Sequence, residues 1–593
     1  MNGHASLLPF PGLAWGPYPQ RRTVAGDPDR WTRLRRRAGG WLMLGRQLAG
    51  PWERQADRHF ARAVLARARG HESCSKDELD SRLRGLRALL SRDGLQPAHL
   101  AAVLGLLVEY CRRTLDTTPF DTQLVAVRVL LRNRLAEVAT GEGKTLAAGL
   151  AAAVAALAGI PVHVVTANDY LVERDRTMLR PLFDALGLPS AQVLPADAPA
   201  QRRAAYRSPI VYATARELAF DYLRDRLLLD RGEPELMAHL RGLSGQTDDA
   251  GGPLMQGLCM AILDEADSVL LDEACTPLVL SRPCSHPAPA QEYRQAHAIA
   301  RQLWINRDFR LDPVYRQATL TAAGRRRVRE TAQAQQHATI HARHREALVA
   351  TALAALHHYR RDRDYLVIDG AITMIDQPTG RLAHGRVWSR GLQQMIELGE
   401  GLDPGPGTET AAQITYQQFF ARYLRLCGMS GSLREARVEL SCVYRQTVTP
   451  VPPRLPCRRR HLGQLVLDDA AGKWMAAARI AARASHCGRA TLIAVDSVAH
   501  ARQLSALLTR RGVRHQLLDA LAHAEEAQII ARAGRSGVVT VATNMAGRGT
   551  DIVLDDAALA CGARSRWCAS STVSGASTAR CSGAALARAS RAR

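Results

Sequence analysis

The chain of 593 residues lacks the features that place a protein in a membrane or outside the cell. Its longest apolar run, residues 146–160, is shorter than the roughly 20 residues that a membrane-spanning helix needs. No charged start followed by an apolar stretch opens the sequence, which argues against a secretory signal. The 12 cysteines form no Cys-x-x-Cys pair, so the sequence predicts neither a disulfide framework nor a zinc site. We therefore expect a protein of the reducing cytoplasm.

Acidic residues are also few. The chain has 56 Asp and Glu against 79 Lys and Arg, which gives a formal net charge of +23. This surplus indicates a nucleic acid, an anionic membrane surface or an acidic polypeptide as partner, without choosing among them. Hydrophobic residues make up 47% and charged residues 23% of the chain, which excludes global disorder and is typical of globular domains with sizeable cores.

Both ends of the chain differ in composition from the middle. Residues 1–75 are rich in Arg, Trp, Gly and Pro, and we expect a basic, loosely ordered extension there. As a helix, residues 31–48 would lie on an anionic bilayer, and a solvated basic linker is the open alternative. Residues 557–593 contain no acid and show little periodicity, which predicts a basic low-complexity tail.

Between the two ends, short apolar segments alternate with helical patterns. The expected buried strands are residues 161–166, 210–212, 260–263 and 538–542. This alternation predicts an α/β protein with doubly wound parallel sheets. Residues 276–405 have long polar helices and an Arg/His-rich stretch, which indicates an inserted domain.

A glycine-rich pentapeptide is the most informative motif: Gly141, Glu142, Gly143, Lys144 and Thr145. The glycines let backbone N–H groups approach phosphate oxygens, and the following helix adds the positive end of its dipole. Lys144 would reach the β and γ phosphates, and the Thr145 hydroxyl would ligate Mg²⁺. A strict phosphate loop has one more glycine where this chain has valine, so an ordinary glycine-rich turn remains the alternative.

Two carboxylates follow the apolar segment 260–263. Asp264 and Glu265 would project from the carboxyl edge of a parallel sheet, where nucleotides bind. Asp264 would hold Mg²⁺ through water, and Glu265 would polarise the attacking water. The alternative is an acidic turn in which Asp267 caps a helix.

Two further segments fit a nucleotide site. The Gln123 amide can both donate to and accept from adenine, which would select ATP over GTP, although an ordinary surface glutamine is the alternative. Residues 543–551 follow a predicted strand and place glycines around Arg548 ahead of Asp551. They suit a loop from a second sheet, so that ATP would sit between two similar domains.

These motifs together resemble the SecA preprotein translocase motors, relatives of the superfamily 2 helicases. The resemblance runs from about residue 118 to residue 554. The stretches that carry it include PFDTQL, AEVATGEGKTLAA, HVVTANDYLVERD, ILDEADSVLLDEACTPL, PTGRLAHGRVWSRGL, GMSGS and VTVATNMAGRGTDIVL.

The resemblance implies two RecA-like nucleotide-binding domains and an inserted α+β preprotein-crosslinking domain. The first would span residues 76–275 and be completed by about 406–445, the insert 276–405, and an incomplete second domain 446–556. The nucleotide contacts it implies are Gln123, Gly141, Glu142, Gly143, Lys144, Thr145, Arg548 and Asp551. The catalytic residues it implies are Lys144, Asp264 and Glu265, with Mg²⁺ at Thr145 and Asp264 and no zinc site.

The activity implied is that of a protein-transporting ATPase, which pushes unfolded preproteins through a membrane channel. The implied partners are preproteins, the channel and anionic phospholipids, at the inner face of the bacterial plasma membrane. No specific nucleic acid is expected, and the choice between monomer and homodimer stays open. Two alternatives remain: a hydrolysis-deficient ATP-binding remnant of such a motor, and a DEAD-type RNA helicase suggested by residues 264–267.

One departure bears on the activity. After Leu554 the chain lacks the family's Gln…Gly-Arg…Arg-Gln-Gly motif, and a missing arginine finger costs about 10³–10⁵ in rate. Back-translation of residues 575–592, read one base earlier with free wobble bases, restores such a motif. We therefore expect a C-terminal truncation by frameshift, with a native basic disordered tail as the alternative.

Overall fold

The computed structural model describes most of the chain. The described residues are 18–21, 50–229, 252–283, 290–313, 316–334, 341–361, 363–368, 370–376, 381–383, 388, 391–405, 408–456, 465, 467, 469–495, 498–518, 526–543, 552, 554–561 and 565–569. The Arg/Trp-rich stretch 31–48 lies outside them. Within these ranges, no helix combines the length and the hydropathy of a membrane span.

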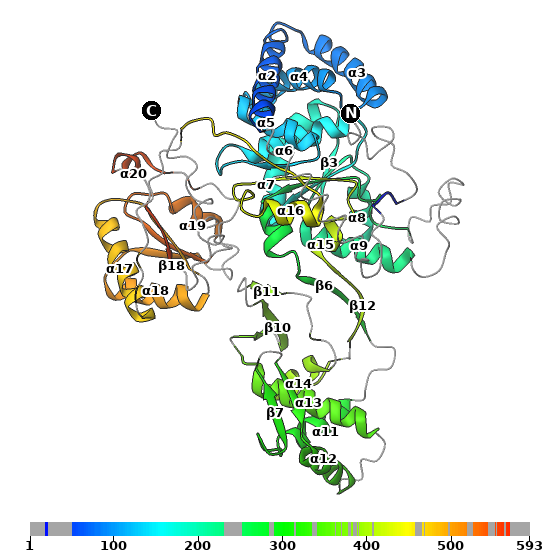
Figure 1. The fold of residues 1–593 in the computed structure, drawn as a ribbon, viewed down its shortest axis with the longest axis vertical. Coiled ribbons are helices and arrows are strands. Elements are labelled where there is room, and N and C mark those ends of the chain that lie inside the picture. Colours follow the sequence, from blue (N-terminus) through cyan, green and yellow to red (C-terminus); the bar gives the residue numbers. More distant parts are fainter. Residues whose placement is uncertain are drawn as a thin grey trace.

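The centre of the molecule is a parallel sheet of seven strands in the order β14-β1-β13-β5-β2-β4-β3 (Figure 1). Its strands are β1 Leu135–Glu137, β2 Val162–Thr166, β3 Ser190–Gln192, β4 Ile210–Thr214, β5 Met260–Asp264, β13 Arg425–Ser430 and β14 Val448–Pro450. Every pairing in it is parallel, which confirms the predicted α/β fold class.

Helices cover both faces of this sheet, so its strands are buried on both sides. The covering elements are α5 Asp121–Leu131, α6 Lys144–Leu157, α7 Asp169–Ala185, α8 Pro199–Tyr206, α9 Ala215–Leu229, η1 Ser268–Asp272, α15 Tyr416–Phe420 and α16 Arg437–Tyr444. Helix α6 is rich in alanine and is buried along nearly its whole length, because small side chains let it lie close to the sheet.

Three helices cap one end of this lobe: α2 Gly50–Arg69, α3 Lys76–Asp93 and α4 Pro97–Leu115 (Figure 1). The expectation of a loosely ordered extension up to residue 75 is therefore wrong from Gly50 onward. Helix α2 buries Phe60 and Val64 within the main core, and Arg128 of α5 lies over the Phe60 ring at 4.6 Å. Arg58, Arg62, Arg67 and Arg69 of α2 are exposed, so the composition of this segment does not reveal the apolar face of the helix.

Residues between β6 Pro277–Pro283 and β12 Thr408–Thr415 form a separate unit with its own core around Phe309, Leu353 and Met395. Its elements are α11 Ala290–Ala300, β7 Phe309–Asp312, β8 Gln317–Leu320, α12 Ala322–Ala334, α13 Ala342–His358, β9 Tyr365–Ile368, β10 Ala371–Asp376, β11 Arg381–Ala383 and α14 Leu392–Gly399. Strands β6 and β12 pair in antiparallel fashion into a ribbon that joins this unit to the seven-stranded lobe (Figure 1). We call β6 and β12 the hinge ribbon.

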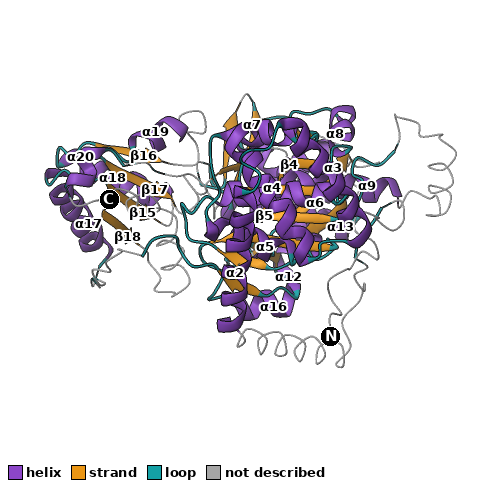
Figure 2. Ribbon diagram, turned by 90° about the horizontal axis from the view of Figure 1, so that it is seen from above, coloured by secondary structure: helices purple, strands orange, loops and turns teal. Residues whose placement is uncertain are grey.

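A second parallel sheet has the strand order β16-β17-β15-β18 and lies to one side of the first (Figures 1 and 2). It contains β15 Thr491–Val495, β16 His515–Leu518, β17 Val539–Thr543 and β18 Ser565–Ala569, with α17 Ala470–His486, α18 Val498–Arg510, α19 Glu526–Arg532 and α20 Asp556–Ala560. Strand β18 pairs with β15 inside residues 557–593, whose composition predicts a basic low-complexity tail.

A buried histidine in β2 gives a testable consequence for stability. The Nδ1 atom of His163 lies 2.8 Å from the Tyr423 hydroxyl, and burial lowers the pKa of His163 from 6.5 to about 4. As the pH falls from 6.5 to 4, His163 therefore becomes protonated in the unfolded chain but stays neutral in the folded protein. Stability should decrease across this window by about 3 kcal/mol.

The variant His163→Asn keeps a hydrogen-bonding group beside Tyr423 and should remove most of this pH dependence. Urea unfolding at pH 7 and at pH 4.5 measures the difference for wild type and variant. The exposed His59 provides the matched control, His59→Asn, which should keep the wild-type difference in unfolding free energy between the two pH values. The same difference in His163→Asn as in wild type would contradict the role given to His163.

Candidate nucleotide-binding site

The glycine-rich loop connects the end of β1 to the start of α6. Gly141 has φ +81° and Gly143 has φ +77°, a left-handed conformation that glycine adopts without strain. Gly143 is the N-cap of α6 and supplies no side-chain cap to the first turn. The free N–H groups at a helix N-terminus of this kind, reached through a glycine loop, can donate hydrogen bonds to phosphate oxygens.

The first residue of α6, Lys144, forms a buried ion pair. Its Nζ is paired with Glu265 Oε1 and lies 4.0 Å from Asp264 Oδ1, and all three side chains are at most 10% exposed. Burial opposes the charge of Lys144, but the carboxylates of Glu265 and Asp264 outweigh it and raise the pKa of the lysine. Burial raises the pKa of Asp264 to about 6, against the opposing effect of Lys144.

The structure thus brings together residues that stand about 120 positions apart in the sequence. Strand β5 ends at Asp264, and Glu265 follows with φ +53°, a left-handed conformation that is uncommon for a residue with a side chain. The backbone N–H of Glu265 donates to Asp264 Oδ1 at 3.1 Å. Strained residues of this kind are often found at functional sites, where the surrounding structure holds them in place.

The last residue of the acidic motif contacts a segment that sequence reasoning did not assign to the site. Asp267 accepts a hydrogen bond from the Ser432 hydroxyl, and Ser432 closes the GMSGS motif that follows β13. Asp267 also accepts from the Ser268 N–H at 3.0 Å, as the helix-cap alternative predicted. Because β13 lies between β1 and β5, this contact ties the acidic motif to the strand beside the phosphate loop.

Gln123 of α5 holds the glycine-rich loop by its side chain. Its Nε2 donates to the carbonyl oxygens of Glu142 at 3.1 Å and Gly143 at 3.2 Å, and its Oε1 accepts from the Phe120 N–H at 2.8 Å. A Cβ at Gly143 would collide with this amide, which is a second reason for glycine there. The adenine contact predicted for Gln123 stays a prediction.

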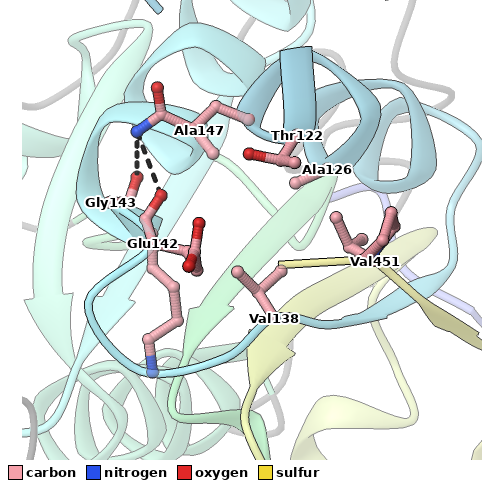
Figure 3. A pocket seen from close by; sticks show the side chains of 10 residues that line it. Thr122, Ala126, Val138, Glu142, Gly143, Ala147 and Val451 are labelled. Atoms are coloured by element: carbon pink, nitrogen blue, oxygen red, sulfur yellow. Dashed lines mark hydrogen bonds between the residues drawn. The ribbon is translucent and has the colours of Figure 1, made fainter. Parts of the chain in front are cut away.

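A small pocket lies beside Gln123 and the loop (Figure 3). Its other lining residues include Thr122, Ala126, Val138, Ala147 and Val451. Val138 stands where a strict phosphate loop has glycine, and it is buried within the main core.

The segment after β14 was not expected at this site. Arg454 donates its backbone N–H to Glu142 Oε2 at 3.2 Å, and its guanidinium lies 4.3 Å from the centre of the Phe120 ring. This segment leads toward the second sheet, and the sequence alone gave no signal for its contact with the loop.

Of the remaining predicted site residues, the structure describes Thr145. Thr145 is the second residue of α6 and is half-buried. Arg548 and Asp551 lie outside the described residues, so their place at the nucleotide stays a prediction. Among the residues that the structure describes, no group of three His, Cys, Asp or Glu side chains could hold a metal by itself.

The family profile described as the SecA DEAD-like domain matches residues 51–441, and the SecA P-loop domain matches residues 456–579. The chain belongs to the SecA family. The SecA relatives include the protein translocase subunit SecA 2 of Nitrosospira multiformis, with 39% identity over 92% of this chain and 81% of the relative. The SecA 2 of Bordetella avium is 43% identical over 79% of this chain and 70% of the relative.

Two solved helicase structures also align with this chain, at low sequence identity. Dbp5 of S. cerevisiae, bound to RNA and ADP BeF3, aligns over 80% of this chain and 89% of its own, with 13% identity and a TM-score of 0.32. The DUF1998 helicase MrfA, bound to DNA and AMPPNP, aligns over 79% of this chain and 50% of its own, with 10% identity and a TM-score of 0.36.

The buried ion pair of this SecA-family site should contribute to the stability of the protein without bound nucleotide. Lys144→Met leaves two buried carboxylates without their cation and should destabilise the fold by about 3–5 kcal/mol in urea unfolding. The double variant Lys144→Met/Glu265→Gln should recover part of this loss, because a neutral amide needs no counter-ion.

The exposed Lys76 supplies the matched control, since Lys76→Met should change stability by less than about 0.5 kcal/mol. A Lys144→Met protein as stable as wild type would show that the pair contributes no net stability.

Proposed function

We propose that this chain is an ATP-driven motor that pushes unfolded preproteins through a membrane translocation channel. The observation that carries the proposal is the buried set of Lys144, Glu265 and Asp264 at the carboxyl edge of the first sheet. Membership of the SecA family supports the same function, since the two SecA 2 relatives named above carry the name protein translocase subunit.

The residues present suit ATP with Mg²⁺. The loop offers uncapped helix N–H groups and a protonated lysine for phosphate oxygens, and Thr145 and Asp264 offer the oxygen ligands that Mg²⁺ prefers. The bound Mg²⁺ would neutralise charge on the transferred phosphoryl group. Lys144 would exchange Glu265 for the β and γ phosphate oxygens, which would free the Glu265 carboxylate to orient and deprotonate the attacking water.

Gln123 would contact the adenine edge only after its amide releases the backbone groups that it binds in this structure. Arg548 and Asp551 would contact the nucleotide from the second sheet. Closure of the two lobes on ATP, followed by opening after hydrolysis, would then drive motion. The unit carried by the hinge ribbon would act as the preprotein-crosslinking domain and clamp the client chain. An extended, sequence-independent client can be gripped through its backbone at a sheet edge.

The partners that follow from this function are unfolded preproteins, the translocation channel and anionic phospholipids. We infer that the chain works at the inner face of the bacterial plasma membrane, where the net charge of +23 favours anionic lipid. The family match favours this reading over a DEAD-type RNA helicase, and no specific nucleic acid is needed to explain the charge.

A single substitution tests the catalytic role of Glu265. Glu265→Gln should keep ATP binding while lowering ATP turnover about 10²–10⁴-fold, because the general base is lost and the charge on Lys144 is retained. Binding is measured with a fluorescent ATP analogue and turnover by phosphate release, with and without an unfolded preprotein. Glu330, which is exposed on α12, gives the matched control Glu330→Gln with wild-type turnover.

Wild-type protein that binds ATP but turns it over no faster than Glu265→Gln would favour the hydrolysis-deficient alternative. Turnover stimulated by RNA and indifferent to preprotein would overturn the translocase function in favour of the helicase.

A further inference from the structure

A four-residue segment near the N-terminus, residues 18–21, docks against the first lobe (the short dark-blue piece in Figure 1). The Leu258 N–H donates to the Pro19 carbonyl oxygen at 2.7 Å, and the Arg21 N–H donates to the Arg422 carbonyl oxygen at 2.7 Å. Leu258 and Arg422 stand just before β5 and β13, so the segment crosses the amino ends of two central strands. We call residues 18–21 the strap.

The first residue of the strap is held by a buried carboxylate. The Tyr18 hydroxyl donates to Asp225 Oδ2 at 3.1 Å, and Asp225 is fully buried on α9. Asp225 also accepts from the backbone N–H groups of Leu254 and Met255, at 2.6 Å and 2.9 Å. Burial and the neighbouring Asp225 raise the pKa of Tyr18, so its hydroxyl remains a donor at all physiological pH values.

Pro19, the second residue of the strap, packs closely against Gly257 of the lobe. Gly257 has φ +103°, and a Cβ added there would lie 2.6 Å from Pro19 Cγ and 2.8 Å from Pro19 N. Only glycine permits both this backbone conformation and this approach. The Arg21 guanidinium completes the contact, since its Nη2 donates to the Leu424 carbonyl oxygen at 2.9 Å.

The strap is connected by packing to the hinge ribbon. The Tyr18 ring lies 6.3 Å from the Tyr222 ring of α9, and the Tyr222 ring lies 5.4 Å from that of Phe419. Phe419 belongs to α15, which begins directly after β12, and α9 itself contacts both strands of the ribbon. The Tyr222 hydroxyl also donates to Gln20 Oε1 at 3.1 Å.

We propose that the amino edge of the first sheet holds a peptide-docking site whose in-cis ligand is the strap, and that occupancy of this site sets the mobility of the hinge ribbon. The ligand it takes is an extended peptide of the type Tyr-Pro-x-Arg. Its tyrosine reaches Asp225, its proline packs on Gly257, and its arginine reaches the Leu424 carbonyl. When the strap leaves, α9 loses the packing that supports the base of the ribbon, and the inserted unit gains freedom to swing.

Hydrogen exchange on the full chain tests this proposal. In the variant Tyr18→Ala/Arg21→Ala, amides of residues 252–259 and of β6 and β12 should exchange about tenfold faster than in wild type or more. A synthetic peptide of residues 16–23, added in excess to the variant, should restore protection in both places. The same peptide with alanine at the position of Tyr18 should restore none.

Tyr170→Ala provides the control, because Tyr170 is 53% exposed and lies on α7, away from the strap contacts. It should leave exchange in the ribbon unchanged. Unchanged exchange at residues 252–259 in the strap variant would overturn the proposed docking site. Faster exchange at residues 252–259 with unchanged exchange in β6 and β12 would overturn the coupling of the strap to the hinge ribbon. The experiment is done without nucleotide, so its outcome is independent of ATP turnover.

Discussion

The buried charge of Lys144 is the constraint on which the arrangement of the site depends. An ammonium group removed from water is costly unless the fold supplies opposite charge close by. Here Glu265 and Asp264 supply it from the end of β5, and Glu265 does so in a left-handed backbone conformation. The ion pair keeps the lysine protonated and links the glycine-rich loop to the acidic motif. In the proposed function, phosphate oxygens would replace Glu265 as partners of Lys144, and this exchange would make the site responsive to nucleotide.

Topology explains why such distant residues meet. In a parallel sheet the carboxyl ends of all strands lie at one edge, so the loops after β1, β5 and β13 converge there. Asp267 and Ser432 add a hydrogen bond across this edge, and Gln123 fixes the loop from α5. The opposite edge carries the strap, which reaches the hinge ribbon through α9. In the two proposals above, the carboxyl edge would face the nucleotide, and the amino edge would support the ribbon that carries the inserted unit.

Much of this could be predicted from sequence, because the signals are local. The apolar segment 260–263 followed by Asp264 and Glu265 predicts a strand with carboxylates at its end, and the glycine pattern around Lys144 predicts a loop entering a helix. Contacts between distant segments could not be predicted in this way. The Tyr18–Asp225 hydrogen bond spans 207 positions, and the Arg454–Glu142 contact spans 312. Helix α2 was missed for another reason. Its arginines give the segment a basic composition, while a narrow apolar face that includes Phe60 and Val64 packs against the core.

The central claim is that Lys144 leaves Glu265 for a nucleotide phosphate while Asp551 approaches from the second lobe. A high-resolution structure of the full chain with Mg²⁺ and a non-hydrolysable ATP analogue measures this directly. The account predicts the Lys144 Nζ within about 3 Å of a β or γ phosphate oxygen, Glu265 released toward water, and Asp551 at the nucleotide. An analogue bound elsewhere, or a Lys144 still paired with Glu265 beside it, would contradict the account.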